Sequence, residues 1–529
     1  MRKYKCSIAI LFSLFCISAS KAQHADLLII NGRILNGSGN SWIRGDIAIV
    51  NEKIVAIGRL LNWQANKIID AQQNIVAPGF IDVHTHIEGD EMANPYASNF
   101  IHDGVTTVIT GNCGSSILPI SKYLAFIDSL KLSVNVATLA GHNNIRRLVM
   151  GDENRQPSEQ ELLTMQYNME QAMQQGALGL STGLIYTPGM YAHTDEIIAL
   201  AKSTAKYKGI YASHIRDEGD SVIPAINEAI EVCKAAHIPV EISHFKVSGP
   251  QNWGKSAETL LLIANARAAG LEVVIDQYPY TASSTSLSTL LPDDVLAGGY
   301  AAAAQKLTDY KTREYAVAYM LAKLHKRKLE HYSYAVVAWF EPDKSLQGKS
   351  IEAINILYGK PHTSLAEANT IIDLLIQSNA GMVFHGMSEN DVAHIASYPF
   401  NIPASDASIR IFGAGQPHPR GYGTHCRFIK LIVNEGKIVS LEEAIRRMTS
   451  LPAQQYNLPL RGMLLPGYFA DIVIFDPSKI TDHATYEQPH QYASGFNYVI
   501  VNGTVVLEND IQNDVRTGKV IFGPGYIGK

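Results

Sequence analysis

Two histidines separated by one residue stand where an apolar run ends. His84 and His86 close the segment that begins with the run Ile75–Val83, which is typical of a buried strand. Because side chains two residues apart on an extended strand share a face, both imidazoles are expected to point the same way. Two imidazoles side by side at a strand end supply half of a metal site.

Four further candidate ligands stand in or just after short β-prone runs. They are Cys113 after Thr106–Thr110, His214 after Ile210–Ser213, His244 after Val240–Ser243, and Asp406 after Tyr398–Ala404. Taken singly, each is as often an ordinary core or surface residue, and Asp406 also fits a surface turn. Taken together, metal ligands at successive strand ends, separated by helical stretches, are typical of a catalytic barrel.

Three of these residues match the ligand chemistry of zinc. Cys113 as a thiolate, with His214 and His244 as neutral imidazoles, gives a three-ligand zinc centre with one open position. The expected bonds are about 2.3 Å to sulfur and about 2.0–2.1 Å to nitrogen. Zinc lowers the pKa of the water it binds towards about 7, which makes hydroxide available at neutral pH.

The elements that must position these ligands alternate between strand and helix. Examples are a helix at Gln160–Gln175, a strand at Leu178–Ser181, a helix at Asp195–Tyr207 and a strand at Leu271–Ile275. Such alternation indicates parallel strands joined by crossover helices. Residues from about 287 to 372 fit this alternation of strands and helices less well, and we interpret them as an insertion that could cover the site. Within it, Thr312–Lys328 is expected to be a basic helix and Ala335–Trp339 a strand.

Both ends of the chain are strand-rich and broken by turn residues. Residues 23–76 and 458–529 share this pattern of short apolar runs separated by turn residues; Asp46–Val50 and Ala470–Phe475 are examples of the runs. We therefore predict an α/β fold in which residues 77–457 form a (β/α)8 TIM-type barrel and the two ends together build a small β-sandwich.

Length, charge and the N-terminus limit the possible partners and the compartment. The chain has 529 residues, 46% hydrophobic content and a net charge of −5, with no basic bias to attract nucleic acid or an anionic membrane. Residues 1–22 are typical of a secretory signal peptide: Arg2, Lys3 and Lys5 precede the apolar core Ser7–Ile17, and Ser20–Ala22 resembles a cleavage site. We expect an exported protein, periplasmic or secreted, with no membrane attachment after cleavage.

The cysteines do not form a disulfide scaffold. Cys6 and Cys16 lie in the predicted signal, and three cysteines remain in the mature chain. Of these, Cys233 falls in a predicted helix at Val222–Ala236, where a small buried hydrophobe is the simpler interpretation.

At this point the motifs of the chain resemble a known family. They are Ala77–His86, Gly104–Gly114, Gly176–Leu184, Ser213–Arg216, Glu241–His244, Asp276–Thr285, Ser405–Asp406 and His418–Arg420. Over nearly all of the mature chain, the sequence resembles the amidohydrolase superfamily and, within it, the D-aminoacylases (N-acyl-D-amino-acid deacylases). The first motif marks only the superfamily. The Gly111–Gly114 segment, Gly-Asn-Cys-Gly, is more specific, since most relatives bridge their metals with a modified lysine.

The resemblance implies a metal site and an activity. It places a tightly held zinc on Cys113, His214 and His244. It places a second, weaker site on His84, His86 and Asp406, with Cys113 able to bridge both; whether one or two metals are needed stays open. Asp406 would accept a proton from the attacking water and deliver it to the departing amine. The implied reaction is zinc-dependent hydrolysis of N-acyl-D-amino acids to a carboxylate and a free D-amino acid.

The resemblance also implies substrate-binding residues for this small molecule. Arg420 and Lys246 are the candidate cations for the substrate carboxylate, and Lys246 shares a strand face with His244 by the period of two. Tyr278 and Ser284 match positions that hydrogen-bond the carboxylate, and Tyr186 matches one that polarises the scissile carbonyl. Tyrosine and serine after a strand are also common as turn or rim residues.

The chain departs from the family pattern after Asp406. The stretch to Arg420 is longer than expected, and His425 stands where the family commonly has an aromatic residue. We interpret His425 and Cys426 as an ordinary pair at a helix start rather than as a second metal site. Two other functions remain as alternatives: another amide hydrolase of the superfamily (a dihydroorotase-like cyclic amidase or a dipeptidase), and a non-catalytic exported metal-binding protein.

Overall fold

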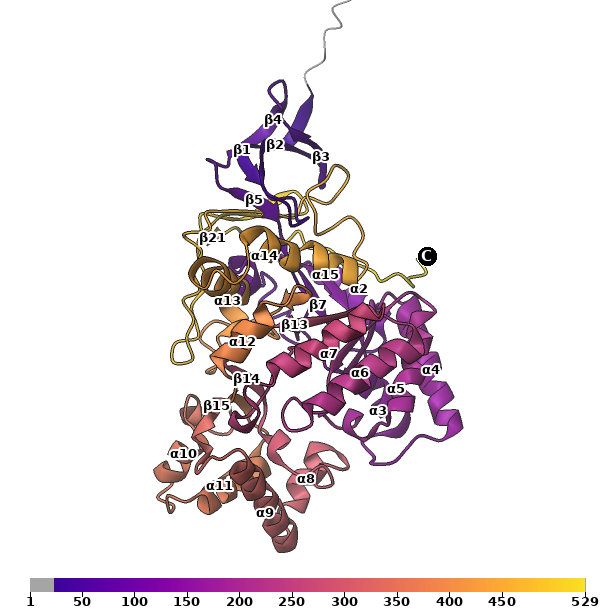
Figure 1. Cartoon of the computed structure of the whole chain (residues 1–529), viewed down its shortest axis with the longest axis vertical. Coiled ribbons are helices and arrows are strands. Elements are labelled where there is room, and N and C mark those ends of the chain that lie inside the picture. Colours follow the sequence, from indigo (N-terminus) through magenta and orange to yellow (C-terminus); the bar gives the residue numbers. More distant parts are fainter. Residues whose placement is uncertain (1–22, 529) are drawn as a thin grey trace, which may run out of the picture.

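The computed structural model describes residues 23–528 (Figure 1). The predicted signal peptide, 1–22, lies outside the described residues and stays a prediction. Within the described part, no helix combines the length and the apolar character needed to cross a membrane. In Figure 1 the strands β1–β4 occupy one end of the molecule and the helices α8–α11 the opposite end, with parallel strands and their helices between them.

Strands from the two chain ends pair in one nine-stranded sheet. Its members are β1 (His24–Ile34), β2 (Ile43–Val50), β3 (Lys53–Gly58), β4 (Gln64–Asp70), β5 (Ile75–Pro78), β18 (Ile472–Phe475), β19 (Phe496–Val501), β20 (Thr504–Glu508) and β21 (Ile511–Gln512). The two ends meet where β18 pairs antiparallel with β5, which in turn pairs parallel with β1. Buried isoleucines such as Ile29, Ile47 and Ile472 form the core of this sheet. A separate β-sandwich domain stays a prediction.

The centre of the molecule is an α/β core of parallel strands. Its strands are β6 (Phe80–Asp82), β7 (Val105–Thr110), β8 (Asn135–Thr138), β9 (Ala140–Gly141), β10 (Gly179–Gly183), β11 (Ile210–His214), β12 (Val240–Ile242), β13 (Val273–Gln277) and β17 (Asn401–Pro403). They form two sheets, ordered β6-β7-β8 and β17-β13-β12-β11-β10-β9. Every residue of these strands is buried, as expected for parallel strands covered by helices.

Helices follow most of these strands and cover them from outside (Figure 1). They are α1 (Ser98–His102), α2 (Ile120–Leu130), α3 (His142–Met150), α4 (Glu159–Gln174), α5 (Thr194–Ala205), α6 (Val222–Ala236), α7 (Ser256–Ala268), α12 (Glu389–Ala396), α13 (Arg420–Arg427), α14 (Leu441–Met448) and α15 (Ser450–Gln455). A capping box starts α4: the Ser158 hydroxyl accepts from the Glu161 N–H, and the Glu161 carboxylate accepts from the Ser158 N–H.

The two parallel sheets meet along both of their edges. On one side β8 pairs with β7 and the adjoining β9 pairs with β10, so a single stretch of chain belongs to both sheets. On the other side the Asp406 N–H donates to the His84 carbonyl and the His86 N–H donates to the Ala407 carbonyl, each at 2.9 Å. This second junction lays Asp406 directly beside the two histidines that follow β6.

Phe80, the first residue of β6, joins the parallel core to the end sheet. Its fully buried ring packs edge-on against Phe475 and Phe496, with ring centroids 6.4 and 6.1 Å away. Burying a side chain of this size stabilises the fold by about 1.5–3 kcal/mol. The strand that precedes the two histidines is therefore anchored at its start.

A segment between β13 and β17 folds around its own sheet and core. Three antiparallel strands, β14 (Ala282–Ser286), β15 (Ala335–Trp339) and β16 (Gly381–His385), pair in the order β14-β16-β15. The helices α8 (Gly299–Lys306), α9 (Tyr310–Lys326), α10 (Ile351–Leu357) and α11 (Ser364–Gln377) pack with them around residues such as Leu287, Met320, Phe340 and Ile371. The predicted insertion, 287–372, lies inside this inserted segment, whose paired strands extend it on both sides to 282–385.

Candidate active site

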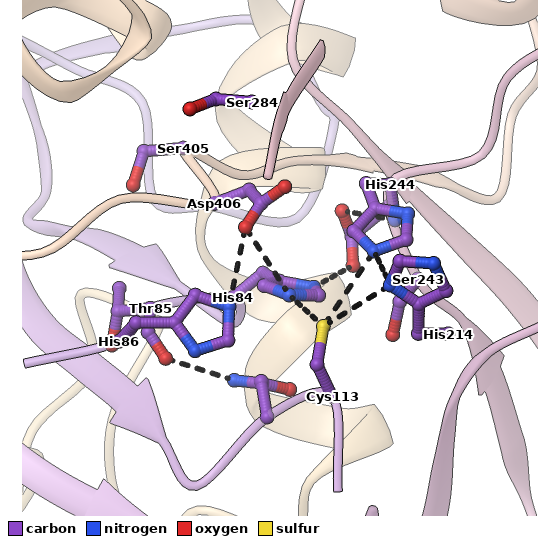
Figure 2. A network of polar contacts seen from close by, with 12 residues as sticks. His84, Thr85, His86, Cys113, His214, Ser243, His244, Ser284, Ser405 and Asp406 are labelled. Atoms are coloured by element: carbon purple, nitrogen blue, oxygen red, sulfur yellow. Dashed lines mark hydrogen bonds and ion pairs between the residues drawn. The ribbon is translucent and has the colours of Figure 1, made fainter. Parts of the chain in front are cut away.

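The candidate metal ligands converge on the sulfur of Cys113 (Figure 2). The Sγ atom lies 3.3 Å from His84 Nε2, 3.5 Å from His214 Nδ1 and 3.6 Å from His244 Nε2. These side chains come from the ends of four different strands and are all buried. Strand ends far apart in the sequence therefore supply one compact cluster of nitrogen and sulfur donors.

Asp406 closes the cluster on the side of the histidine pair. Its Oδ1 atom lies 3.2 Å from His86 Nε2 and 3.6 Å from His84 Nε2 (Figure 2). Its Oδ2 atom lies 2.9 Å from Arg420 Nη1. The carboxylate thus bridges the cluster of candidate ligands and a cationic group.

Backbone conformation aims three of these side chains inward. Cys113, His244 and Asp406 have φ values of 52°, 37° and 49°, a region that residues other than glycine rarely adopt. Such conformations persist where the surrounding structure enforces them, and they cluster at functional sites. Each one turns the chain sharply just after its strand, so that the side chain faces the cluster.

The glycines on either side of Cys113 allow close packing. A Cβ atom at Gly111 would lie 2.3 Å from the Leu139 carbonyl oxygen, and one at Gly114 would lie 2.3 Å from Asn143 Oδ1. Both glycines also have positive φ, 77° and 75°. The Gly-Asn-Cys-Gly motif is therefore a packing requirement that fixes the position of the sulfur.

Electrostatics favours the ionised forms of the thiol and the carboxyl group. Burial alone raises the pKa of the Cys113 thiol, but the charges of His84 and His214 outweigh it and hold this pKa well below its usual range. Burial likewise raises the pKa of Asp406, but the charges of Arg420 and His84 outweigh it and hold this pKa well below its usual range. Thiolate and carboxylate are the forms that bind cations.

The donor set fits a zinc-like cation. Cys113, His214 and His244 present ligand atoms that all lie within 4.8 Å of one another. So do His84, His86 and Cys113. Burial and the charge of His244 lower the pKa of His214, whereas Asp276 raises the pKa of His84 and Asp406 raises that of His86.

A pocket of about 480 Å³ opens over the cluster. Its lining includes every predicted substrate-binding residue: Tyr186, Lys246, Tyr278, Ser284 and Arg420. The predicted ligand His84 does not line it, because its side chain is fully buried beneath the other ligands.

Each predicted substrate-binding side chain has a defined neighbour. The Arg420 guanidinium lies over the Tyr278 ring, 4.4 Å from its centroid, and Nη2 is 3.4 Å from the Ser284 carbonyl oxygen. The Tyr186 hydroxyl is 2.9 Å from Thr285 Oγ1, and its ring lies edge-on to His214. The pocket floor is therefore built from both the parallel core and the inserted segment.

The predicted reason for the position of Lys246 is wrong, although the residue is in the pocket. Strand β12 ends at Ile242, and His244 lies in a turn with positive φ, so no strand period relates the two side chains. The Lys246 ammonium reaches His244 Nδ1 at 2.7 Å because the chain folds back after this turn.

Sequence reasoning missed two carboxylates that orient the histidines, the partly buried Glu218 and the fully buried Asp276. Glu218 Oε1 lies 2.8 Å from His244 Nδ1 and 2.6 Å from Lys246 Nζ. Asp276 Oδ2 lies 3.0 Å from His84 Nδ1. Carboxylates of this kind fix the ring and leave the other nitrogen for the metal. Asp276 opens one of the family motifs, whereas Glu218 is signalled only by its place four residues after His214.

We expect Glu218→Gln to weaken zinc binding about 10–100-fold, the usual effect of removing a partner of a metal-ligating histidine. The amide keeps the shape but loses the charge that faces His244 and Lys246. Competition against a chelator measures the affinity. The matched control is Glu228→Gln, which removes a carboxylate that pairs with Arg216 outside the cluster. Equal zinc affinity in both variants would contradict the role of Glu218.

His425 and Cys426 lie in α13, away from the ligand cluster. The N–H of Cys426 donates to Asp103 at 2.8 Å, and His425 Nδ1 lies 2.8 Å from the same carboxylate. The His425 ring stacks on Phe80 with centroids 5.7 Å apart. His425 therefore occupies an aromatic packing position rather than a ligand position.

Comparisons with known proteins agree with this geometry. The model of the amidohydrolase family matches residues 67–507. A D-aminoacylase of Alcaligenes xylosoxydans xylosoxydans is 32% identical over 528 residues, covering 96% of this chain and 99% of the relative. An N-acyl-D-aspartate deacylase of the same organism is 33% identical and covers 95% of each chain.

Solved structures show the same likeness. The N-acyl-D-glutamate deacylase of Bordetella bronchiseptica, in complex with zinc and a phosphonate inhibitor that mimics the tetrahedral intermediate, superposes with a TM-score of 0.81 at 31% identity. The match covers 94% of this chain and all of that one. An L-hydantoinase of Arthrobacter aurescens, with a TM-score of 0.51 at 16% identity, shares the fold alone.

Proposed function

The chain belongs to the amidohydrolase family, among relatives that are D-aminoacylases, and we propose that it hydrolyses N-acyl-D-amino acids to a carboxylate and a free D-amino acid with zinc as cofactor. It is a hydrolase of non-peptide carbon–nitrogen bonds. The observation that carries the proposal is the position of Asp406, which touches both the ligand cluster through His86 and the carboxylate-binding candidate Arg420.

We also infer that the parallel strands close into a (β/α)8 barrel, with β8 and β9 counted as one strand. The shared stretch β8–β9 and the bridge between Thr85 and Ala407 support closure at both sheet junctions. On this view residues 77–457 are the barrel, interrupted by the inserted segment, and 23–76 with 458–529 are the accessory β-domain. The site then lies at the carboxyl ends of the strands, as in barrel enzymes generally.

Cys113, His214 and His244 would hold the tightly bound zinc, and His84, His86 and Asp406 a second, weaker site. When bound, the ion supplies Lewis acidity and lowers the pKa of its water to about 7. The fit rests on the donor chemistry: one thiolate, imidazoles of which His84 and His244 have their far nitrogens held by carboxylates, and the Asp406 oxygen that faces His86.

Asp406 moves the proton in this mechanism. Its carboxylate accepts a proton from the attacking water as the carbon–oxygen bond forms. It then returns that proton to the leaving nitrogen as the carbon–nitrogen bond breaks, so the amino acid departs neutral at nitrogen. Tyr186, whose hydroxyl stays protonated because burial raises its pKa well above the usual value, donates a hydrogen bond to the carbonyl oxygen as charge develops there.

Arg420 binds the α-carboxylate of the substrate in this proposal. One edge of its guanidinium pairs with Asp406, and its buried Nε has no hydrogen-bond partner among the described residues. A buried, unpaired donor of this kind costs free energy unless a ligand satisfies it. Lys246, Tyr278 and Ser284 complete the polar wall around this group.

Arg420→Lys should lower kcat/KM about 10–100-fold, mostly through a higher KM, because a lysine cannot offer the planar fork to a carboxylate. Steady-state kinetics on an N-acyl-D-amino acid measures the change. Arg427→Lys, in the same helix but paired with Asp482, is the control and should behave as wild type. An unchanged KM in Arg420→Lys would remove Arg420 from substrate binding.

Reaction class is tested by comparing linear with cyclic amides. We expect amino-acid release from linear N-acetyl-D-amino acids, and no opening of dihydroorotate or hydantoin rings. Ring opening without cleavage of linear substrates would replace the proposal with a cyclic amidase.

We further propose that the protein is exported to the periplasm or the medium, because residues 1–22 have the pattern of a signal peptide. Recovery of the protein only from the cytoplasm would contradict this proposal.

A further inference from the structure

Four side chains that commonly bind metals meet in the inserted segment, outside the pocket. They are His331, before the short turn Tyr332–Tyr334; Glu352 in α10; His362, between α10 and α11; and Glu367 in α11. None of them lines the active-site pocket. In Figure 1, α10 and α11 lie at the end of the molecule opposite the strands β1–β4.

The spacing of these four groups suits one cation. Their ligand atoms all lie within 4.8 Å of one another. Glu367 Oε1 is 2.6 Å from His331 Nδ1, Glu352 Oε1 is 2.6 Å from His362 Nε2, and Glu352 Oε1 is 3.9 Å from His331 Nδ1. Tetrahedral zinc with bonds of about 2.0–2.1 Å needs ligand separations of about 3.3 Å, which these distances bracket.

One of the carboxylates is held in place by the fold. Glu367 is fully buried, and its Oε2 accepts a hydrogen bond of 2.7 Å from the Tyr332 N–H. This contact directs Oε1 towards His331. Metal-ligating carboxylates are typically oriented by such a hydrogen bond from a neighbouring donor.

The two imidazoles are arranged face to face. The rings of His331 and His362 stack with centroids 4.2 Å apart and planes 22° apart. Each ring keeps one nitrogen against a carboxylate: His331 Nδ1 faces Glu367 and His362 Nε2 faces Glu352.

We propose that His331, Glu352, His362 and Glu367 bind a divalent cation of the zinc class. All four positions come from the protein, which makes the site structural and closed rather than catalytic. The ion ties the loop at His362 to both α10 and α11, and it ties all three to His331, which lies just before β15. This proposal does not depend on the reaction at the active site.

Metal content tests the proposal directly. Wild type, His362→Ala and Glu352→Gln are loaded with zinc, freed of excess ion, and analysed for zinc per chain. His362 is 53% exposed, so its removal is tolerated by the core. The control is His325→Ala, an exposed histidine of α9 in the same segment. We expect the two cluster variants to hold one zinc fewer than wild type and the control.

The same comparison in a Cys113→Ser background separates this site from the active site. The difference of one zinc should persist there, and zinc should raise the midpoint of thermal unfolding in that background but not when His362→Ala is added. Equal zinc content with and without His362, in both backgrounds, would overturn the proposal and leave two histidine–glutamate pairs.

Discussion

Asp406→Asn should lower kcat about 10²–10⁴-fold, the usual contribution of a general acid–base group, while the protein keeps the zinc held by Cys113. Asparagine preserves the shape of the side chain and its contacts with His86 and Arg420, which lie 3.2 and 2.9 Å from the carboxylate. It cannot accept the proton of the attacking water. The loss should therefore appear in kcat, with a smaller change in KM.

Single-turnover and steady-state rates on an N-acetyl-D-amino acid, together with zinc per chain, test this result. Asp373→Asn, a partly exposed carboxylate of α11, is the control and should keep wild-type kinetics. Full activity in Asp406→Asn would show that another group moves the proton.

Cys113→Ser should remove the tightly held zinc and lower activity about 100-fold or more, since loss of a direct ligand exceeds the 10–100-fold cost of losing its supporting partner. A serine hydroxyl stays protonated where the Cys113 thiol is driven towards thiolate by His84 and His214. The backbone should survive, because serine is nearly the size of cysteine and the close-packed Gly111 and Gly114 stay unchanged.

Zinc analysis after dialysis and activity with added zinc check this second expectation. Cys233→Ala is the matched control, because Cys233 is buried in α6 among apolar residues and touches no ligand. That variant should retain zinc and activity. The same zinc content per chain in Cys113→Ser as in wild type would mean that the histidines and Asp406 hold the ion without the sulfur.

The local pattern of the sequence predicted the elements that frame the site. Helix α6 has the bounds that its apolar period indicated, Val222–Ala236, and α4 and α5 differ from the predicted ranges by no more than two residues at either end. Each of these helices buries one face, and α4 also begins with a capping box, so local information suffices. The grouping of Cys113 with distant histidines rested on their shared position at strand ends and on motif resemblance, since no local pattern encodes it.

What the sequence could not provide depends on contacts between distant segments. The face-sharing argument for Lys246 failed because a strand period cannot foresee the turn at His244. Glu218 was missed because its role exists only once the loop after β11 meets the chain after β12. The predicted insertion, 287–372, is shorter than the inserted segment of the structure, because β14 and β16 pair with each other rather than with the parallel strands.

The most direct measurement is amino-acid release from paired N-acetyl-D- and N-acetyl-L-amino acids by protein stripped of metal and then reloaded with zinc. We expect release from the D series alone, lost on chelation and restored as zinc returns to the Cys113 site. Undiminished D-series release by the zinc-free protein, or equal release from both series, would contradict the proposal that this chain is a zinc-dependent D-aminoacylase.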